Sequence, residues 1–343
     1  MSATGVELFD ITIIGGGPAG LFAAFYAGMR RMRTKIIDSL DKLGGQLVAL
    51  YPEKFIYDAP GYPAVLARTL AHELIRQAIQ YDPTIVLGEK MQRLVRAGEG
   101  EWHVETDAAV HRTRTVLIAI GGGAFTPKRL PVIGADRFEG RGLYYFVDDL
   151  QQFRNQHILV IGGGDSAVDW ALNLLRVTHR VTLVHRRDQF RAHEDSVEKL
   201  RASPVQVYAF HELRAVDGRD RLETATIFDN RSGQETTLAV DAVLVNIGFT
   251  SSYGALRDWG LQLDAGGIVV NSRMETNLPG VFAAGDITAY PGKLKLIATG
   301  FGEAAIAVNH AKALIDPGSS VFPGHSTTIV PKQRNAARGR GEV

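Results

Sequence analysis

The stretch Ile11-Thr12-Ile13-Ile14-Gly15-Gly16-Gly17-Pro18-Ala19-Gly20 sets the architecture of this chain, and a second version of it follows later. An apolar run typical of a buried parallel strand leads into the spacing G-x-G-x-x-G, which opens the helix of a nucleotide-binding βαβ unit. The second version runs Ile158-Leu159-Val160-Ile161 into Gly162-Gly163-Gly164-Asp165-Ser166-Ala167. Ala167 replaces the last glycine, which this fingerprint permits. The sequence therefore predicts two dinucleotide-binding units, with a chance glycine-rich turn as the alternative for each.

The two fingerprints end in opposite charges. Asp38 lies 23 positions after Gly15, and His185, followed by Arg186 and Arg187, lies 23 positions after Gly162. A carboxylate at this distance accepts hydrogen bonds from ribose hydroxyls, whereas arginines there accommodate a 2′-phosphate. Two different nucleotides are therefore expected. The alternatives are that Asp38 is a strand-end turn residue and that the cluster, with Arg191 nearby, is a solvated charge run.

Composition narrows the class of protein. The chain has 343 residues, a net charge of +1 and a hydrophobic fraction of 45%, which suits two globular domains and argues against a nucleic-acid binder. We see no secretory signal and no apolar stretch of the roughly 20 residues that a membrane span needs, so a cytoplasmic location is expected. There is no cysteine, which excludes a redox disulfide, a catalytic thiolate and cysteine-bound metal. The scattered histidines form no metal motif, so any redox chemistry needs an organic cofactor.

The order of predicted elements is duplicated around the two fingerprints. In the first copy we expect strands over 9–14, 35–38 and 84–87, helices over 18–31 and 67–80, a meander over 91–118 and a strand ending at 121–123. In the second copy we expect strands over 158–161, 181–184, 205–208 and 242–247, a helix over 165–175, another after Glu194, and a meander over 211–240. A strand over 281–287 and a helix over 300–314 return to the first domain.

The predicted class is α/β, with two Rossmann-like domains of the three-layer ββα type. Residues 1–120 and 249–331 form the first domain, which is discontinuous, and residues 121–248 form the second. Residues 332–343 are basic and are expected to be a disordered tail.

Three further positions are candidates with ordinary alternatives. Asp286 follows a strand of small residues and either contacts a cofactor hydroxyl or caps a helix. Tyr51 is either a cofactor contact or a packing aromatic residue. The segment His325-Ser326-Thr327 either contacts a cofactor or is an ordinary stretch near the chain end, because no neighbouring motif indicates a site there.

Taken together, these motifs resemble the two-dinucleotide flavoproteins of the thioredoxin reductase-like group. The run Gly162–Val168, the cluster His185-Arg186-Arg187 and Ala284-Gly285-Asp286-Ile287 carry that resemblance. Thioredoxin reductases have a Cys-x-x-Cys before the second fingerprint, but Phe146 and Asp149 fall at those positions here, so disulfide reduction is ruled out. The chain more closely resembles the thioredoxin reductase-like ferredoxin/flavodoxin–NADP⁺ reductase family, through the segments 44–54, 145–150, 191–194 and 325–327.

The resemblance implies FAD on the first fingerprint, NADP(H) on the second, and a homodimer. It implies that Tyr51 stacks on one face of the isoalloxazine ring and that His325 covers the other, with no acid–base dyad. The positions that it assigns to FAD are Gly15, Gly17, Gly20, Asp38, Gln46, Tyr51, Met91, Phe125, Asp286 and Thr327. The positions that it assigns to NADPH are Gly162, Gly164, Ala167, His185, Arg186, Arg187 and Arg191.

The implied reaction is hydride transfer between NADPH and the flavin, followed by single-electron transfer to ferredoxin or flavodoxin. The glycines at 121–123 and 248 are candidate hinges for domain rotation. Two other functions share both fingerprints. A flavin monooxygenase or NADPH oxidase would turn over oxygen without a carrier, and a non-catalytic redox sensor would bind FAD without turnover.

Overall fold

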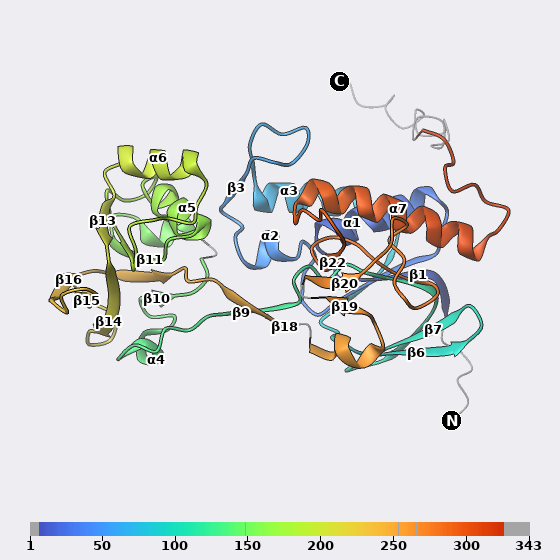
Figure 1. Cartoon of the computed structure of the whole chain (residues 1–343), viewed down its shortest axis with the longest axis horizontal. Helices are drawn as coiled ribbons and strands as arrows, with labels where there is room; N and C mark the ends of the chain where they lie inside the picture. The colour runs from blue at the N-terminus through green and yellow to red at the C-terminus, as the bar shows by residue number, and fades with distance from the viewer. Residues whose placement is uncertain (1–6, 148, 253, 265, 326–343) are drawn as a thin grey trace, which may run out of the picture.

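The computed structural model describes residues 7–325 except 148, 253 and 265, and it has two lobes (Figure 1). The first lobe is built on a seven-stranded sheet with the order β5-β2-β1-β8-β7-β6, in which β21 also pairs with β8. Helices α1, α3 and α7 lie on one side of this sheet (Figure 1). The hairpin β6–β7 extends the sheet, because β7 pairs in antiparallel register with the N-terminal half of β8. The second lobe is built on a five-stranded parallel sheet with the order β10-β17-β11-β12-β13.

The first lobe takes its elements from both ends of the chain. Those from its N-terminal part are β1 (Leu8–Ile14), α1 (Pro18–Met29), β2 (Thr34–Asp38), α2 (Gln46–Ala49), β3 (Phe55–Ile56), β4 (Val65–Leu66), α3 (Ala67–Ala78), η1 (Ile79–Tyr81), β5 (Thr84–Leu87), β6 (Met91–Gly98), β7 (Glu101–Thr106) and β8 (Val110–Ile118). Those from its C-terminal part are η3 (Gly254–Trp259), β19 (Leu263–Asp264), β20 (Gly267–Val269), β21 (Val281–Ala283), β22 (Thr288–Ala289) and α7 (Ile297–Ile315).

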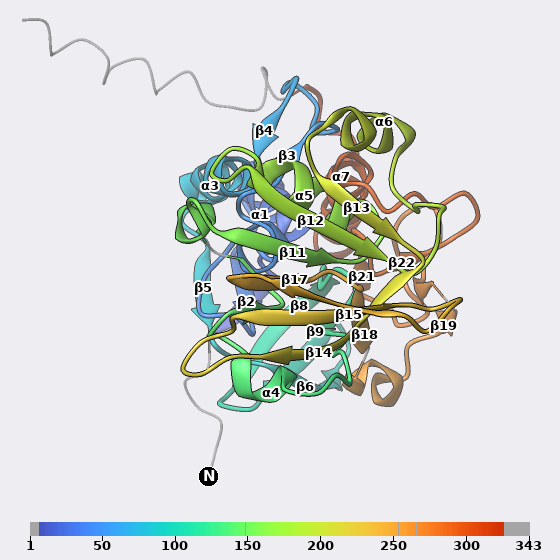
Figure 2. The same ribbon diagram turned by 90° about the vertical axis from the view of Figure 1, so that its left-hand side faces the viewer.

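The second lobe is continuous in sequence. Its elements are α4 (Ala135–Phe138), β10 (Leu143–Tyr144), η2 (Leu150–Phe153), β11 (His157–Ile161), α5 (Asp165–Leu174), β12 (Arg180–His185), α6 (Glu194–Ala202), β13 (Gln206–Ala209), β14 (His211–Asp217), β15 (Thr224–Asp229), β16 (Glu235–Ala239) and β17 (Ala242–Val245). Helices α5 and α6 lie on one side of the parallel sheet, and the antiparallel sheet β14-β15-β16 lies on the other (Figure 2).

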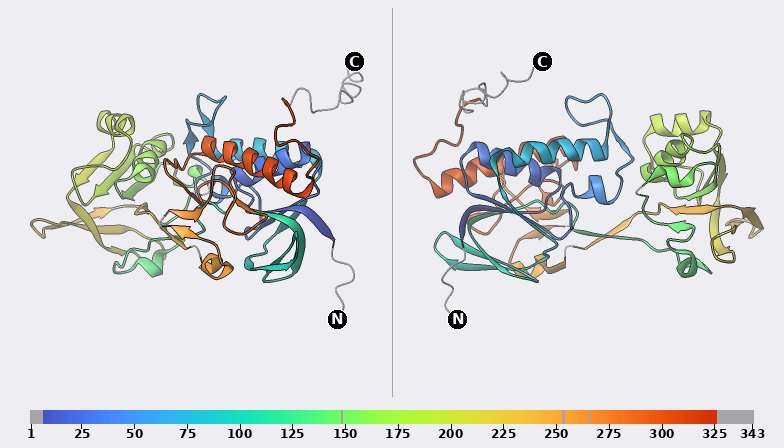
Figure 3. Two further views of the ribbon diagram at one scale, coloured as in Figure 1. Left: turned by 45° about the vertical axis from the view of Figure 1, so that its right-hand side comes forward. Right: turned by 180° about the vertical axis from the view of Figure 1, so that it is seen from behind.

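Two extended segments join the lobes. Strands β9 (Ala124–Pro127) and β18 (Phe249–Ser252) pair with each other in antiparallel register, and they run side by side between the lobes (Figure 3). The glycines at 121–123 immediately precede β9, and Gly248 immediately precedes β18. The candidate hinges therefore stand at the start of each connecting strand.

Each lobe has its own core, and the burial pattern explains its strands. In β1 and β11 the residues that lead into the glycines are fully buried, because helices and a second sheet cover both faces of a parallel sheet. The core of the first lobe includes residues from Ile11 to Ala119 and again from Leu256 to Ala311. Burial of this continuous apolar surface is the main favourable contribution to folding.

The predicted order of strands and helices is confirmed, with shifts at several ends. The strand expected to end at 121–123 is the second half of β8, which begins in the meander at Val110 and ends in the parallel sheet. Its burial alternates at first and then becomes continuous, so its two halves look like separate strands in the sequence. Helix α7 starts at Ile297, three positions before the predicted Gly300. None of the helices among the described residues is long and apolar enough to cross a membrane.

Candidate functional site

The first fingerprint joins the buried strand β1 to helix α1. Gly15 donates its N–H to the carbonyl of Ile37 at 2.8 Å, which ties the loop to β2. Gly17 is the N-cap of α1, and no side chain caps the helix there. Pro18 begins the helix, where its missing N–H costs nothing. The uncapped N–H groups and the helix dipole make this end of α1 suited to a pyrophosphate.

Asp38 lies at the end of β2, directly against the glycine loop. Its Oδ2 accepts the N–H of Gly16 at 2.6 Å, and its Oδ1 accepts the N–H of Leu40 at 2.8 Å. Burial raises the pKa of Asp38, while the N–H donors of Leu40, Gly16 and Ser39 act in the opposite direction. The carboxylate is therefore held at the rim of the loop, where ribose hydroxyls would meet it.

The second fingerprint repeats this arrangement. Gly164 is the N-cap of α5 and also lacks a side-chain cap. His185, at the end of β12, packs directly under Gly163, where an added Cβ would lie 2.2 Å from the imidazole Cε1. The corresponding Cβ on Gly16 would lie 3.0 Å from Oδ2 of Asp38. In both copies, therefore, the middle glycine permits close contact with the side chain 23 positions after the first glycine.

His185 supports the loop from below. Its Nε2 donates to the carbonyl of Gln189 at 3.1 Å, and its ring stacks on Phe190 with centroids 5.2 Å apart. Burial lowers the pKa of His185, and the nearby arginines lower it further. We infer that the imidazole is neutral at pH 7, so the positive charge of this cluster comes from the arginines.

Arg186, Arg187 and Arg191 are exposed around the same loop. Arg191 donates its backbone N–H to the carbonyl of Gly163 at 2.7 Å, which places this residue beside the fingerprint. Across the described part of the chain, none of the three guanidinium groups pairs with a carboxylate. Their donors are therefore available for the oxygens of a phosphate.

Three further predicted residues lie near the carboxyl ends of the first sheet, and a fourth, Met91, lies in its antiparallel part. Gln46 starts α2, and its Nε2 lies 2.9 Å from where a Cβ on Gly121 would stand. Burial raises the pKa of Tyr51 to about 12, and the charge of Asp286 contributes to this shift, so the phenol is neutral. Burial also raises the pKa of Asp286, against the effect of Lys293. Met91 is buried at the start of β6.

The C-terminal candidates are only partly described. The side chain of Phe125 and all of Thr327 and residues 332–343 lie outside the described part of the chain. His325 is exposed, and its ring meets Phe322 edge-on at 5.7 Å. Arg30 donates to Ser319 Oγ at 2.9 Å and to the Ser320 carbonyl at 2.8 Å, which holds that segment at the C-terminal end of α1. That end of α1 lies about 18 Å along the helix from the glycine loop. The stacking of His325 on a flavin therefore stays a prediction.

Lys54, Asp169 and Glu303 were not among the sequence candidates. Lys54 of the first lobe lies 3.0 Å from Asp169 Oδ2 and 3.3 Å from Ser166 Oγ, both on α5 of the second lobe. Its ammonium is also 5.9 Å from the ring centroid of Tyr51. Glu303 is a buried carboxylate in α7. Of these, Glu303 left a signal in the sequence, as the one carboxylate of the apolar helix α7.

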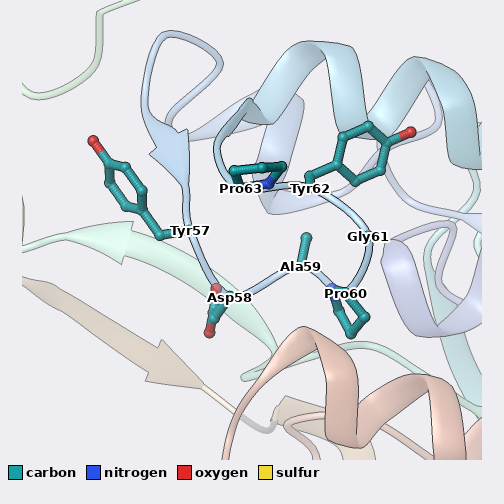
Figure 4. Close-up of a pocket in the computed structure, with 7 residues that line it drawn as sticks. All are labelled: Tyr57, Asp58, Ala59, Pro60, Gly61, Tyr62 and Pro63. Atoms are coloured by element: carbon teal, nitrogen blue, oxygen red, sulfur yellow. The ribbon is translucent and has the colours of Figure 1, made fainter.

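A surface hollow lies apart from both fingerprints. Its lining consists of seven consecutive residues of the loop between β3 and β4, Tyr57–Pro63 (Figure 4). Asp58 is the sole carboxylate in this lining. Because no other element contributes a group, the hollow offers no converging set of contacts for a ligand.

The family model described as pyridine nucleotide-disulphide oxidoreductase matches residues 9–311. The chain belongs to this family. The chain carries two nucleotide fingerprints, but it has no cysteine and hence no redox disulfide of its own.

Relatives and solved structures agree with this assignment. A ferredoxin–NADP reductase of Halalkalibacterium halodurans is 54% identical over 326 residues, which cover 94% of this chain and 98% of the relative. A ferredoxin–NADP reductase of Symbiobacterium thermophilum is 52% identical, over 96% of this chain and 98% of the relative. The thioredoxin reductase of Lactococcus lactis, in its FR conformation, has a TM-score of 0.76 at 28% identity, over 90% of this chain and 99% of that one. The fold of this family member is therefore thioredoxin reductase-like.

The contact of Lys54 with Asp169 should couple the stability of the two lobes. Their side chains are 13% and 35% exposed, so removing one charge leaves the other poorly solvated. A double-mutant cycle with Lys54→Met and Asp169→Asn, followed by denaturant unfolding, should give a coupling free energy of about 1 kcal/mol or more. The exposed pair Lys199–Asp195 on α6 is the control and should give about 0.3–0.5 kcal/mol. Equal coupling energies for the two pairs would contradict the prediction.

Proposed function

We propose that this protein is a ferredoxin (or flavodoxin)–NADP⁺ reductase, with FAD on the first fingerprint and NADP(H) on the second. The observation that carries the proposal is the pairing of two equivalent glycine loops, one against Asp38 and the other beside Arg186 and Arg187. Relatives that are 54% and 52% identical over nearly their whole length bear the name ferredoxin–NADP reductase. The absence of cysteine leaves no disulfide route for the electrons.

The residues present suit these two cofactors. Both helices that follow the glycines begin without a side-chain cap. In both loops, a Cβ on the middle glycine would clash with a neighbouring side chain. The loop at Asp38 would hold a plain ribose, and the loop at His185 would hold a phosphorylated one. When bound, FAD accepts a hydride from NADPH and supplies electrons singly to an external carrier.

The protein's own tasks are binding, orientation and exclusion of water. Arg186, Arg187 and Arg191 would hold the 2′-phosphate through charge-assisted hydrogen bonds. Tyr51, a neutral phenol, would cover one face of the flavin ring, with His325 over the other, while Gln46 and Asp286 contact FAD near the sheet edge. No step in this scheme requires a proton to be moved by a side chain.

The domain boundaries and the hinge belong to the same proposal. We assign 1–120 and 249–331 to the FAD domain and 121–248 to the NADP(H) domain. Because β9 and β18 start directly after glycines, rotation at 121–123 and 248 would swing one lobe relative to the other. X-ray scattering curves recorded during turnover should require more than one lobe orientation. A single orientation that accounts for every curve would contradict the hinge.

A homodimer and a cytoplasmic location complete the proposal. The end of α7 and the segment after it expose Leu314 and Phe322, at 54% and 67%, as apolar surface that a second copy could cover. Light scattering of the purified protein should give twice the chain mass. A cytoplasmic location suits a reaction that draws on NADPH.

The decisive experiment separates the three candidate functions. The purified protein is reduced anaerobically with NADPH, and its cytochrome c reduction is then measured with and without added ferredoxin. We expect rapid flavin reduction and a cytochrome c rate that depends on ferredoxin. Oxygen consumption with no need for a carrier would indicate an oxidase or monooxygenase. Bound FAD with negligible turnover would indicate a sensor.

A further inference from the structure

Glu303 is a buried carboxylate that binds several groups of one loop. It lies in the second turn of α7 and is 3% exposed. Its Oε2 accepts the N–H of Gly285 at 2.7 Å, and its Oε1 accepts the hydroxyl of Tyr290 at 2.5 Å. The ammonium of Lys293, itself 7% exposed on its side chain, forms an ion pair with the same carboxylate. These partners all belong to the loop 285–293, so one side chain holds that loop to the helix.

The loop held by Glu303 carries Asp286 and touches the first fingerprint. A Cβ on Gly285 would lie 3.1 Å from the Cβ of Ala19, in the first turn of α1. Gly285 has φ +81°, which favours glycine, and its Cα lies 3.4 Å from where a Cβ on Gly300 of α7 would stand. The turn Gly285–Asp286 is therefore packed between the N-terminal ends of α1 and α7.

The charges in this region oppose one another. Glu303 raises the pKa of Asp286, whereas Lys293 and Lys295 lower it, so the groups act on the same carboxyl. Because Lys293 and Glu303 are both nearly inaccessible to water, neither charge is strongly screened. Removing one of them changes the local potential, and removing both largely restores it.

We propose that Glu303 and Lys293 form a buried positioning pair that holds the turn Gly285–Asp286 for FAD and balances the charge beside the flavin. This inference rests on the proposed binding of FAD at the first fingerprint. It assigns to α7 a role in cofactor binding that neither fingerprint contains. Glu303 acts through the loop, and its own contacts are with protein groups.

FAD affinity tests the positioning role. Glu303→Gln keeps the shape of the side chain but removes its charge, so the loop loses its ion pair. We expect the dissociation constant for FAD, measured by fluorescence on the reconstituted apoprotein, to rise about tenfold or more. Glu101→Gln is the control, because Glu101 pairs with Arg112 in the meander of the same lobe. That variant should remain within twofold of the wild type.

The flavin midpoint potential tests the charge balance. Glu303→Gln should raise the potential, Lys293→Met should lower it, and the double variant should return close to the wild-type value. If the pair had only a structural role, both single substitutions would shift the midpoint potential in the same direction, or neither would shift it. Equal FAD affinity in Glu303→Gln and the wild type would overturn the inference. So would shifts of the midpoint potential that do not depend on the sign of the charge removed.

A milder variant keeps the test decisive if Glu303→Gln does not fold. Tyr290→Phe removes one hydrogen bond to Glu303 and leaves the ion pair intact. It should weaken FAD binding by about two- to fivefold, and an unchanged affinity would count against the inference. A wild-type protein that binds no FAD would instead overturn the proposed function, so the two failures are distinguishable.

Discussion

The double substitution Arg186→Ala with Arg187→Ala is expected to raise the KM for NADPH by about 100-fold or more. Each charge-assisted hydrogen bond to the 2′-phosphate contributes about 1.5–3 kcal/mol, and NADH has no such phosphate. The KM for NADH should therefore change by only a few fold. Steady-state rates with an artificial one-electron acceptor would measure both constants.

A matched control separates phosphate recognition from a general loss of charge. Arg219 is an exposed arginine of the same lobe, in the turn after β14. Arg219→Ala should leave both KM values within twofold. If the double substitution raised the KM for NADPH and the KM for NADH equally, the cluster would not recognise the 2′-phosphate.

The pH dependence of the preference for NADPH over NADH identifies which group carries the positive charge that binds the 2′-phosphate. Burial lowers the pKa of His185 below its ordinary value of 6.5, so the imidazole binds fewer protons than usual near neutral pH. The ratio of the KM values for NADH and NADPH should therefore stay constant between about pH 7 and 8.5, where arginines remain charged. A ratio that fell steadily over this interval would mean that protonated His185 contributes the charge.

The substitution Gly20→Ala is expected to yield a protein that purifies without FAD. An alanine Cβ at this position would lie 1.9 Å from the carbonyl oxygen of Gly15, and backbone atoms cannot move aside cheaply. The loop must open, so the contacts between Gly16 and Asp38 are lost together with the pyrophosphate site. The ratio of flavin to protein absorbance after purification measures this loss, which we expect to exceed about 90%.

Gly302→Ala provides the control for the intrinsic effect of alanine in a helix. Gly302 lies in α7, is exposed, and has no atom within 4 Å of the position of an added Cβ. This variant should keep its FAD and be about 0.4–1 kcal/mol more stable, because alanine favours the helix. Full FAD occupancy in Gly20→Ala would contradict the close packing of the first loop.

The sequence alone predicted the fold and the chemistry of each fingerprint. Strand–glycine–helix patterns are local, so the apolar runs and the spacing of Gly15 to Asp38 identify β1, α1 and β2 without knowledge of the rest. The equal spacing in the second copy predicted the position of His185 at the end of β12, which the structure confirms.

The finer role of His185 was decided by packing. In the sequence, His185 is the first member of a cationic cluster. In the structure its ring lies beneath Gly163, and burial lowers its pKa, so the imidazole serves as a support for the loop. A charge cluster in a sequence does not show which of its members is desolvated.

Local sequence patterns were enough to predict the pair of nucleotide loops, their opposite charges and the lack of a disulfide route. The contacts between segments far apart in the chain became visible only in the folded protein. Lys54 meets Asp169 across 115 positions, and Glu303 holds Gly285 across 18. Such pairs form only when helices and sheets pack together, so no local spacing in the sequence predicts them. Packing buries these charged side chains, and a buried charge is stable only when it is paired.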